Sequence, residues 1–562
     1  MTGFKIDTFS GKAPKVFARL LPNDMAQVAD NVRLDSGRLD PWKGNAATSI
    51  SPVASYNITQ QTKTLFKYNS SIWIGSNEEL DIARSPIAED PWERIYITGV
   101  GSASGGNGDY PRMTLATIVG SGTYYQLGLP APASLPSAPA LTNKDAAAAT
   151  VTLLADSEVP QSRSYVVTYV TAYGEEGPPS APLISNIVEV YSDQITTVTF
   201  PANVSGNYNI TQKRLYRTDS SGTFRRVAEV PFAQATYADT VNEVNLAEAN
   251  PTASFAAPPD NVSADHKDGP MRGLVSMPNG ILAGFSGQTV CFSEAFQPHA
   301  WPKDFQLTVK SDIVALAPMT NGLLVLTKEK PAMIQGLSPS NMAMSEIDST
   351  LSCVSKRSVV DMGEYVIYAS PDGLVMGGEQ GLKLATGDLL TRDQWQEIVP
   401  TSLVGFFWEG HYIGFYSTGS EDKGFIFDPR GGKNSFSALD FHATAGYNDL
   451  ETDELYLVVS GSVVKFAQGS ALNFKWRTKK FYTPSPINPA VAKVDCDSYS
   501  PNPVFKLYSD GVLKHTQTVT NSDSFRLPSG YKGQEFEAEI TGSVAVNEIC
   551  VYESAREIGS NA

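Results

Sequence analysis

The chain has 562 residues, of which 41% are hydrophobic and 18% charged, and its formal net charge is −16 at pH 7. A chain of this length exceeds one compact core, so three or four folded units are expected, and the composition excludes a disordered polyanion. The acidic balance argues against a protein that grips nucleic acid by neutralising its phosphates. With 45 Gly, 36 Pro, 25 Phe and 24 Tyr, the composition predicts many short strands joined by turns and a mostly β fold.

The cysteines and the apolar segments restrict the cellular context. Cys291, Cys353, Cys496 and Cys550 lie far apart in no metal-binding spacing, which predicts buried free thiols. The start MTGFKIDTFS has no basic region followed by an apolar run, so no signal peptide is expected. No apolar stretch approaches the roughly 20 residues that span a bilayer. We therefore expect a protein made and folded in the cytoplasm.

Residues 9–45 predict an extended segment, a short helix and a tight hairpin. Asn23 and Asp24 are good N-cap residues, and apolar residues follow at i, i+3, i+4 and i+7. This spacing predicts a helix with one apolar face. The turn at 35–38 contains Gly37, which can adopt a positive φ and close a hairpin. The apolar positions are Met25, Val28, Ala29 and Val32.

Residues 63–128 predict a first set of strands. Hairpin turns are expected at 69–71 and 120–122. Residues 101–108, GSASGGNG, predict a loop that is no phosphate cradle, because no Gly-Lys-Ser/Thr follows. The Pro-, Ala- and Ser-rich residues 129–147 predict a linker. We therefore place the first unit at residues 1–130.

Residues 131–258 predict an inserted unit. An alternating, half-buried strand at 164–173 precedes the turn at 174–180, in which Glu175 and Glu176 are expected to be exposed to solvent. The pattern Tyr-x-x-Thr-x5-Gly-Glu-Glu-x-x-Pro-Ser, followed by Arg-x-Tyr-Arg-Thr and Tyr-x-Asp, resembles a fibronectin type III-like β-sandwich. Such a module is mostly a spacer or a docking surface.

Residues 259–470 are internally repetitive. A turn followed by a strand recurs from residues 277, 319, 362 and 408, with a weaker copy near 452. A period of about 40–50 residues is typical of propeller blades. We predict a β-propeller that residues 63–128 help to close, and the alternative is a row of sandwiches. Residues 384–400 are the best candidate for a helix in a blade connection.

Residues 471–562 predict a last unit, a jelly-roll-like β-sandwich. Residues 474–481 alternate apolar and basic side chains, which gives a strand with one cationic face. That face could contact phosphate, but a solvated surface or an acidic neighbouring subunit is the favoured interpretation in so acidic a chain. Trp42 stands beside Pro41 at a turn, as expected of an aromatic residue at a blade or an interface. The interface candidates are Trp42, Lys475, Arg477, Lys479 and Lys480.

No enzyme constellation rises above chance. The five His residues are scattered without a metal-binding pair, and no Gly-x-Ser-x-Gly elbow is present. His411 and His442 adjoin apolar strands, where a structural role is favoured. The sequence does not rule out a pair of carboxylates that act as in a glycosidase, because acidic residues are numerous. We predict no enzymatic activity and assign no catalytic, cofactor-binding or metal-binding residue.

Both ends of the chain carry motifs of one known family. The N-terminal order Gly-x-x-Pro, Leu-x4-Ala-x-x-Ala-x-Asn and Ser-Gly-x-Leu-x-Pro-x-x-Gly resembles the start of tail nozzle proteins (tail tubular protein B type) of short-tailed bacteriophages. The C-terminal residues Phe474-x-Trp476, Tyr508-x-Asp510-Gly511 and Phe525-Arg526-x-Pro528 are similar to the end of that family. The matching N-terminal residues are Gly11, Pro14, Leu21, Ala26, Ala29, Asn31, Ser36, Gly37, Leu39, Pro41 and Gly44.

The resemblance implies a structural component of a virion tail. It implies a ring of six copies below a tail adaptor ring, with tail fibres or spikes outside and genomic DNA passing through the lumen without sequence recognition. The ring would hold the DNA until contact with the host envelope opens it, and an acidic lumen would repel phosphate. The alternative is a receptor-binding or glycan-cleaving propeller tail protein.

Overall fold

The protein is mostly β, with many four-stranded antiparallel sheets. The computed structural model describes residues 3–50, 52–54, 56–101, 110–144, 158–260, 268–430, 436–554 and 556. The chain divides into two compact units. Unit 1 comprises residues 1–77, 324–333 and 345–562, and unit 2 comprises residues 78–323 and 334–344.

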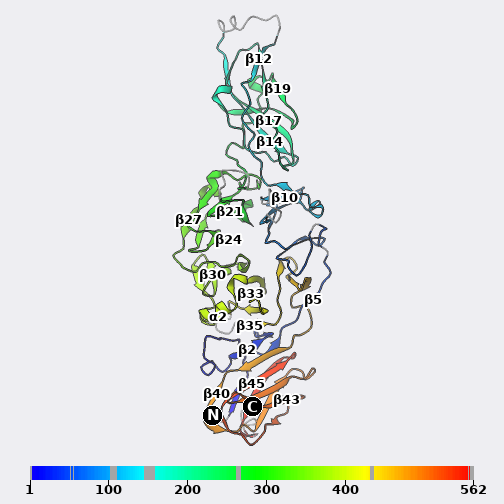
Figure 1. Cartoon of the computed structure of the whole chain (residues 1–562), viewed down its shortest axis with the longest axis vertical. Helices are drawn as coiled ribbons and strands as arrows, with labels where there is room; N and C mark the ends of the chain where they lie inside the picture. Colours follow the sequence, from blue (N-terminus) through cyan, green and yellow to red (C-terminus); the bar gives the residue numbers. More distant parts are fainter. Residues whose placement is uncertain are drawn as a thin grey trace. The chain divides into compact units, whose positions relative to one another are not determined.

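Unit 1 contains the later repeats as groups of antiparallel strands (Figure 1). The strands form a β6-β7 hairpin, the sheet β28-β29-β30-β31, the run β32-β33-β34-β35 and the sheet β36-β37-β38-β5. Their bounds are β5 Ala46–Ala47, β6 Thr64–Asn69, β7 Ile72–Ser76, β28 Val360–Asp361, β29 Val366–Ala369, β30 Leu374–Gly378, β31 Gly381–Leu384, β32 Val404–Trp408, β33 His411–Ser417, β34 Asp422–Phe427, β35 Phe436–Leu439, β36 Ala445–Asp449, β37 Glu454–Val459 and β38 Ser462–Lys465.

Unit 2 contains two further four-stranded sheets, β11-β10-β9-β8 and β20-β21-β22-β23. A further four-stranded sheet has the order β24-β25-β26-β27. The bounds are β8 Asp81–Arg84, β9 Arg94–Thr98, β10 Arg112–Leu115, β11 Tyr125–Gln126, β20 Arg272–Ser276, β21 Leu282–Ser286, β22 Thr289–Phe292, β23 Gln306–Thr308, β24 Ile313–Met319, β25 Gly322–Thr327, β26 Ala332–Gln335 and β27 Ala343–Glu346. Strands follow the predicted repeat starts at 277, 319, 362, 408 and 452.

The inserted region of unit 2 has its own hydrophobic core, which includes Tyr165, Val167 and Leu215. Its strands form the sheets β12-β16-β19, β14-β17-β18 and β13-β15. The predicted strand at 164–173 is confirmed as β14, but the expectation that it is half-buried is wrong, because all of its residues are buried. The bounds are β12 Ala140–Asn143, β13 Gln161–Arg163, β14 Tyr165–Thr171, β15 Val188–Val190, β16 Gln194–Thr199, β17 Ile210–Thr218, β18 Phe224–Pro231 and β19 Thr236–Asp239.

The C-terminal strands of unit 1 form two sheets around one hydrophobic core. One sheet is β1-β46-β41-β44, and the other continues from β39 through β45 and β42 to β43, with β40 paired to β45. The first strand, β1, pairs antiparallel with the last, β46, so these two strands are neighbours at the end of unit 1 (Figure 1). The bounds are β1 Gly3–Ile6, β39 Phe474–Thr478, β40 Phe481–Ile487, β41 Val491–Cys496, β42 Val504–Ser509, β43 Val512–Thr518, β44 Phe525–Arg526, β45 Gly533–Gly542 and β46 Val546–Tyr552.

The helix predicted over residues 23–32 is wrong, because Ala26–Asp30 is a strand, β2. It pairs antiparallel with β39 and in parallel with β35, and thereby joins the repeat sheet to the C-terminal sheets. Ala26 and Ala29 are buried in the C-terminal core, whereas Met25 packs in the core of the repeats. An isolated helix of ten residues is marginal in water, and pairing on both edges satisfies the backbone instead. The helical spacing of the apolar residues in this segment thus results from their burial in two different cores.

Other local predictions are confirmed. The hairpin around Gly37 forms between β3 (Val32–Arg33) and β4 (Asp40–Pro41), and Gly37 has a φ of 80°. The predicted helix in 384–400 is α2, Arg392–Glu397, capped by reciprocal bonds between Thr391 and Gln394. All four cysteines are free and buried. The predicted glycine-rich loop falls mostly on residues 102–109, outside the described residues.

Asn31 fixes the exit from β2. It has a φ of 54°, a region that Asn tolerates better than most residues. Its Nδ2 donates to the Asn473 carbonyl at 3.2 Å, and its Oδ1 accepts from the Asp440 amide at 3.2 Å. Its own amide donates to the Ala438 carbonyl, and its carbonyl accepts from the Trp42 amide. One buried side chain therefore ties the end of β2 to the segments that follow β35 and precede β39.

We expect Asn31→Ala to lower the free energy of unfolding by about 2–4 kcal/mol, because it removes two buried side-chain bonds and strains the positive φ. Asn31→Gly is the matched control: it keeps the backbone conformation and loses only the bonds, so its cost should be smaller. Urea unfolding of the full chain measures both. Equal midpoints for Asn31→Ala and the natural chain would contradict this role.

Candidate functional site

The predicted cationic face is present on β39 and the residues that follow it, but acidic residues of the same chain cover part of it. Arg477 Nε lies 2.9 Å from Glu537 Oε2, and Lys475 Nζ lies 3.7 Å from Glu539 Oε2. Lys480 Nζ donates to Glu535 Oε2 at 3.1 Å. These glutamates all belong to β45, the neighbouring strand. These three cations therefore have acidic partners within the chain, and a contact with an acidic neighbouring subunit stays a prediction.

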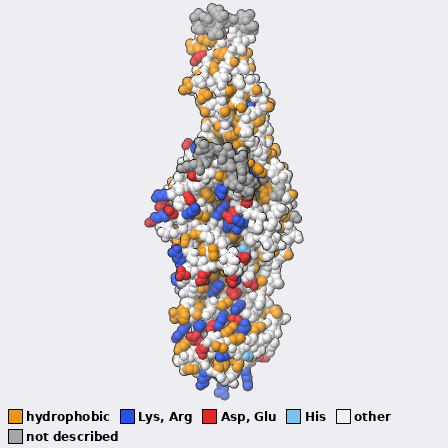
Figure 2. Space-filling model, viewed as in Figure 1, with side chains coloured by type: hydrophobic (Ala, Val, Ile, Leu, Met, Phe, Trp, Pro, Cys, Tyr) orange, Lys and Arg blue, Asp and Glu red, His pale blue; other side chains and the backbone are white. Residues whose placement is uncertain are grey.

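The fourth cation of that face differs from the others. Lys479 Nζ donates to Asn23 Oδ1 at 3.3 Å and lies 5.7 Å from the centre of the Phe481 ring. Burial lowers the pKa of Lys479 from its ordinary value. Figure 2 shows basic and acidic side chains intermingled over the end of unit 1 where Figure 1 places β40 and β43.

Trp42 is not available as a surface contact, because only 2% of it is exposed. Its ring lies 5.7 Å from that of Trp408 and 6.1 Å from that of Phe466. The Arg33 guanidinium lies 5.1 Å from the Trp42 ring centre. Trp42 therefore packs inside unit 1, between the N-terminal hairpin and the repeat sheets.

The expectation that Glu175 and Glu176 are solvent-exposed is wrong, because both are buried. Glu175 Oε1 accepts from Arg94 at 2.7 Å, and Glu176 Oε1 accepts from Thr168 at 2.6 Å and from Tyr216 at 2.7 Å. Arg214 also pairs with Glu176. Buried carboxylates need such partners to offset the loss of hydration. This network lies within unit 2 and leaves no free nucleophile or base.

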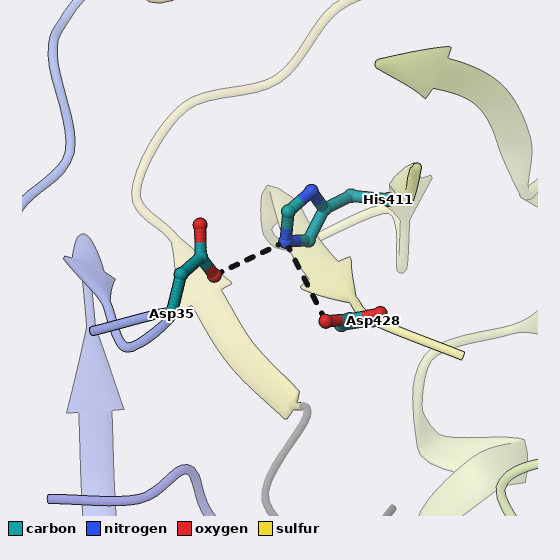
Figure 3. A group of neighbouring side chains, drawn as sticks. All are labelled: Asp35, His411 and Asp428. Atoms are coloured by element: carbon teal, nitrogen blue, oxygen red, sulfur yellow. Dashed lines mark hydrogen bonds and ion pairs between the residues drawn. The ribbon is translucent and has the colours of Figure 1, made fainter. Parts of the chain in front are cut away.

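A second ionic cluster in unit 1 was not predicted (Figure 3). His411 is the first residue of β33, Asp428 follows β34, and Asp35 lies in the turn of the N-terminal hairpin. His411 Nε2 lies 3.3 Å from Asp35 Oδ1 and 4.0 Å from Asp428 Oδ2. The three ligand-type atoms all lie within 4.8 Å of one another.

Each member of this cluster is held by a further bond. His411 Nδ1 lies 3.1 Å from the Glu409 carbonyl oxygen. Arg33 Nε donates to Asp35 Oδ2 at 2.7 Å, and Arg430 Nε donates to Asp428 Oδ1 at 3.0 Å. The hydrogen bond with His411 lowers the pKa of Asp35 to about 2, so this carboxylate is ionised at neutral pH.

The cluster adjoins a cavity of about 280 Å³. The His411 side chain is 4% exposed, whereas that of Asp35 is 39% exposed. Phe9, Val32, Ile426 and Phe436 supply apolar walls. The described lining residues contain no cysteine, and each carboxylate among them is paired to a guanidinium, which does not favour nucleophilic chemistry.

Sequence spacing could not reveal this cluster, because Asp35 and His411 are 376 residues apart. The only local signal was that His411 adjoins an apolar strand, which favoured a structural histidine. The predicted hairpin turn at 35–38 placed Asp35 in a turn but gave it no partner.

Comparisons with known proteins give only distant structural similarity. No family model matches the chain, and no curated protein matches it. BBS1N in complex with ARL6DN is 10% identical with a TM-score of 0.24, over 45% of this chain and 86% of that chain. Hsv2 of Kluyvelomyces marxianus is 7% identical with a TM-score of 0.24, over 47% and 69%. KlHsv2 with loop 6CD replaced by a Gly-Ser linker is 9% identical with a TM-score of 0.23, over 59% and 95%. TM-scores of this size carry no argument about function.

One further observation concerns membranes. Among the described residues, no helix has both the length and the apolar character needed to cross a bilayer.

The Asp35 carboxylate predicts a pH dependence of stability. Its folded pKa of about 2 lies below its ordinary value of 3.8, so its contribution is complete above pH 3.8 and is lost as the pH falls through 2. Because the side chain is partly exposed, solvent screening reduces this contribution to about 1 kcal/mol. We expect the urea midpoint of the natural chain to fall more steeply between about pH 4 and pH 2 than that of Asp35→Asn. Parallel curves would contradict the ion pair.

Proposed function

We propose that the protein is the nozzle ring of a short bacteriophage tail, built around a β-propeller with an inserted fibronectin type III-like module and a C-terminal jelly-roll-like sandwich. In this proposal the chain is a structural protein that assembles in a ring of six copies below an adaptor ring. The ring encloses the DNA channel, carries fibres or spikes outside, and opens on contact with the host envelope.

The propeller part of the proposal is supported by the way the repeat sheets are completed. The short N-terminal strand β5 supplies the outer strand of the sheet that ends with β38, one of the last repeat strands. Completion of a late sheet by an early strand is the usual way in which a propeller closes. Consecutive sheets also pack together: β32 contacts β28 and β36 in unit 1, and β8 contacts β20 in unit 2.

The nozzle assignment is carried by the positions of the N-terminal motif residues. Ala26, Ala29 and Leu39 are buried in the core shared with the C-terminal strands, and Asn31 joins β2 to both of its neighbouring segments. Gly44 donates to the Ser470 carbonyl at 2.7 Å. The motif that resembles the nozzle family thus builds the joint between the repeats and the C-terminal sheets, which is a role that a shared architecture would preserve.

The charge of the chain supports passage of DNA more than capture of it. The net charge is −16, and the cations of the β39 face are paired with β45 glutamates. An acidic lumen would repel phosphate over a distance of about 8–10 Å at physiological salt.

A surface patch in unit 1 is our candidate for contact with a second copy of the chain. Phe17 and Leu20 are 68% and 73% exposed. The loop that carries them lies against β40, since the Lys480 amide donates to the Ala18 carbonyl and Arg19 lies 3.9 Å from the Tyr482 ring centre. A patch that combines exposed apolar side chains with cations is complementary to the acidic surface of an identical chain.

Electron microscopy of virions with an antibody against this chain tests the proposal. We expect the label at the lower end of the tail, and we expect native mass measurement of the purified protein with its adaptor to show a ring of six. Label on the head or the fibres would contradict the proposal. Release of reducing sugars from host polysaccharide would favour the glycan-cleaving alternative.

Substitution of the two exposed apolar residues of the patch tests the contact between copies of the chain. We expect Phe17→Ser combined with Leu20→Ser to reduce ring formation at least tenfold while leaving thermal unfolding of the single chain unchanged, because both side chains are exposed. The matched control exchanges Val512 and Leu513, which are 55% and 47% exposed on β43. Loss of rings in the control, or normal rings in the patch variant, would exclude the patch.

A further inference from the structure

We propose that Asp35, His411 and Asp428 form a binding site for a divalent transition-metal cation, for which Zn²⁺ is the best fit. The site would fasten the N-terminal hairpin to the end of the β33–β34 pair. This inference goes beyond the proposed nozzle function and does not depend on it. It rests on the tautomer of His411, on the charges of the cluster and on the spacing of the three ligand atoms.

The tautomer of His411 follows from the hydrogen-bond partner of its Nδ1 atom. A carbonyl oxygen can only accept, so the contact with the Glu409 carbonyl places a proton on His411 Nδ1. Nε2 faces the two carboxylates, and its hydrogen bond to Asp35 requires a second proton on the ring; in a neutral imidazole Nε2 carries a lone pair instead. A lone pair directed at carboxylate oxygens is unfavourable unless a positive charge lies between them. Nδ1 bonded to a backbone carbonyl is also the arrangement that orients histidine for metal binding through Nε2.

Among the described residues, the charged groups that contact the cluster carry one more negative than positive charge. Its carboxylates are Asp35, Asp428 and Glu409, and its guanidinium groups are Arg33 and Arg430. Arg33 pairs with Asp35 and Glu409, whereas Arg430 pairs with Asp428. Either a proton on His411 Nε2 or a bound cation supplies the missing charge.

The geometry of the free oxygens fits a metal ion in place of that proton. The guanidinium groups occupy one oxygen of each aspartate, Asp35 Oδ2 and Asp428 Oδ1, and thereby leave Asp35 Oδ1 and Asp428 Oδ2 directed at Nε2. Tetrahedral Zn²⁺ with bonds of about 2.0–2.2 Å separates its ligands by about 3.3–3.5 Å. The 3.3 Å distance already fits, and the 4.0 Å distance requires a shift of about half an ångström.

The donor set selects the kind of ion. One imidazole and two carboxylates without a thiolate suit Zn²⁺ or Mn²⁺, whereas Ca²⁺ prefers six to eight oxygen ligands. Three protein ligands leave one position for water, and the adjoining cavity has room for it. The ion would bridge two segments that are 376 residues apart in sequence.

Calorimetric titration of the chelator-treated full chain with Zn²⁺ at pH 7.5 tests the site. We expect one ion per chain and a rise in the thermal unfolding midpoint on binding. Asp428→Asn should weaken binding at least tenfold, because it replaces an anionic ligand and keeps the side-chain shape. His442→Ala is the matched control, since His442 contacts the Phe415 ring and lies outside the cluster. The affinity of this variant for Zn²⁺ should equal that of the natural chain.

Further outcomes separate the proposal from its competitors. Absence of stoichiometric Zn²⁺ binding, with His411 protonated at pH 7.5 by nuclear magnetic resonance, would show that a proton alone balances the cluster and would overturn the proposal. Binding that Asp428→Asn leaves unchanged would overturn it as well. If Asp428→Asn fails to fold, Asp35→Asn supplies a second ligand variant, and it too should weaken Zn²⁺ binding.

Discussion

The structure of unit 1 depends on Ala26–Asp30, a strand that pairs along its length with β39 and at Asp30 with β35. Through this strand, β2, the backbone hydrogen bonds of the repeat sheet at β35 continue into the C-terminal sheets at β39. The alanines of β2 are small enough to lie inside the C-terminal core, and Asn31 holds the sharp exit that follows. Without this strand, β35 and β39 would each lose a neighbour, and a buried row of amides and carbonyls would be left without partners.

Buried charged side chains are likewise paired within the chain. Although the chain is strongly acidic, its buried carboxylates in both units lie against guanidinium or ammonium groups: Glu537 and Glu539 beside β39 and β42, and Glu175 and Glu176 beside Arg94 and Arg214. Such pairs bring modest net stability, but removing one partner is costly. The basic side chains therefore hold strands and hairpins in register, and the negative charge that remains is on the surface.

Local patterns predicted much of the fold. Period-two alternation identified β14 and β39, turn residues identified the hairpins at 35–38 and 69–71, and Thr391 with Gln394 capped a helix inside the predicted range. The errors came from partners distant in the sequence. Residues 23–32 have a helical spacing because they face two different cores, and Glu175 and Glu176 are buried because Arg94 and Arg214 reach them from other strands. The Asp35, His411 and Asp428 cluster exists only after the N-terminal hairpin meets β33 and β34, so no single stretch encodes it.

The pairing of β1 with β46 has a consequence for biosynthesis. Strand β1 is synthesised long before β46, and Phe4 and Ile6 lack part of their core until β46 has been made. Nascent chains that stop early cannot complete this sheet and keep apolar side chains exposed to chaperones and proteases. Interrupted translation products would thereby be removed before they could enter an assembly.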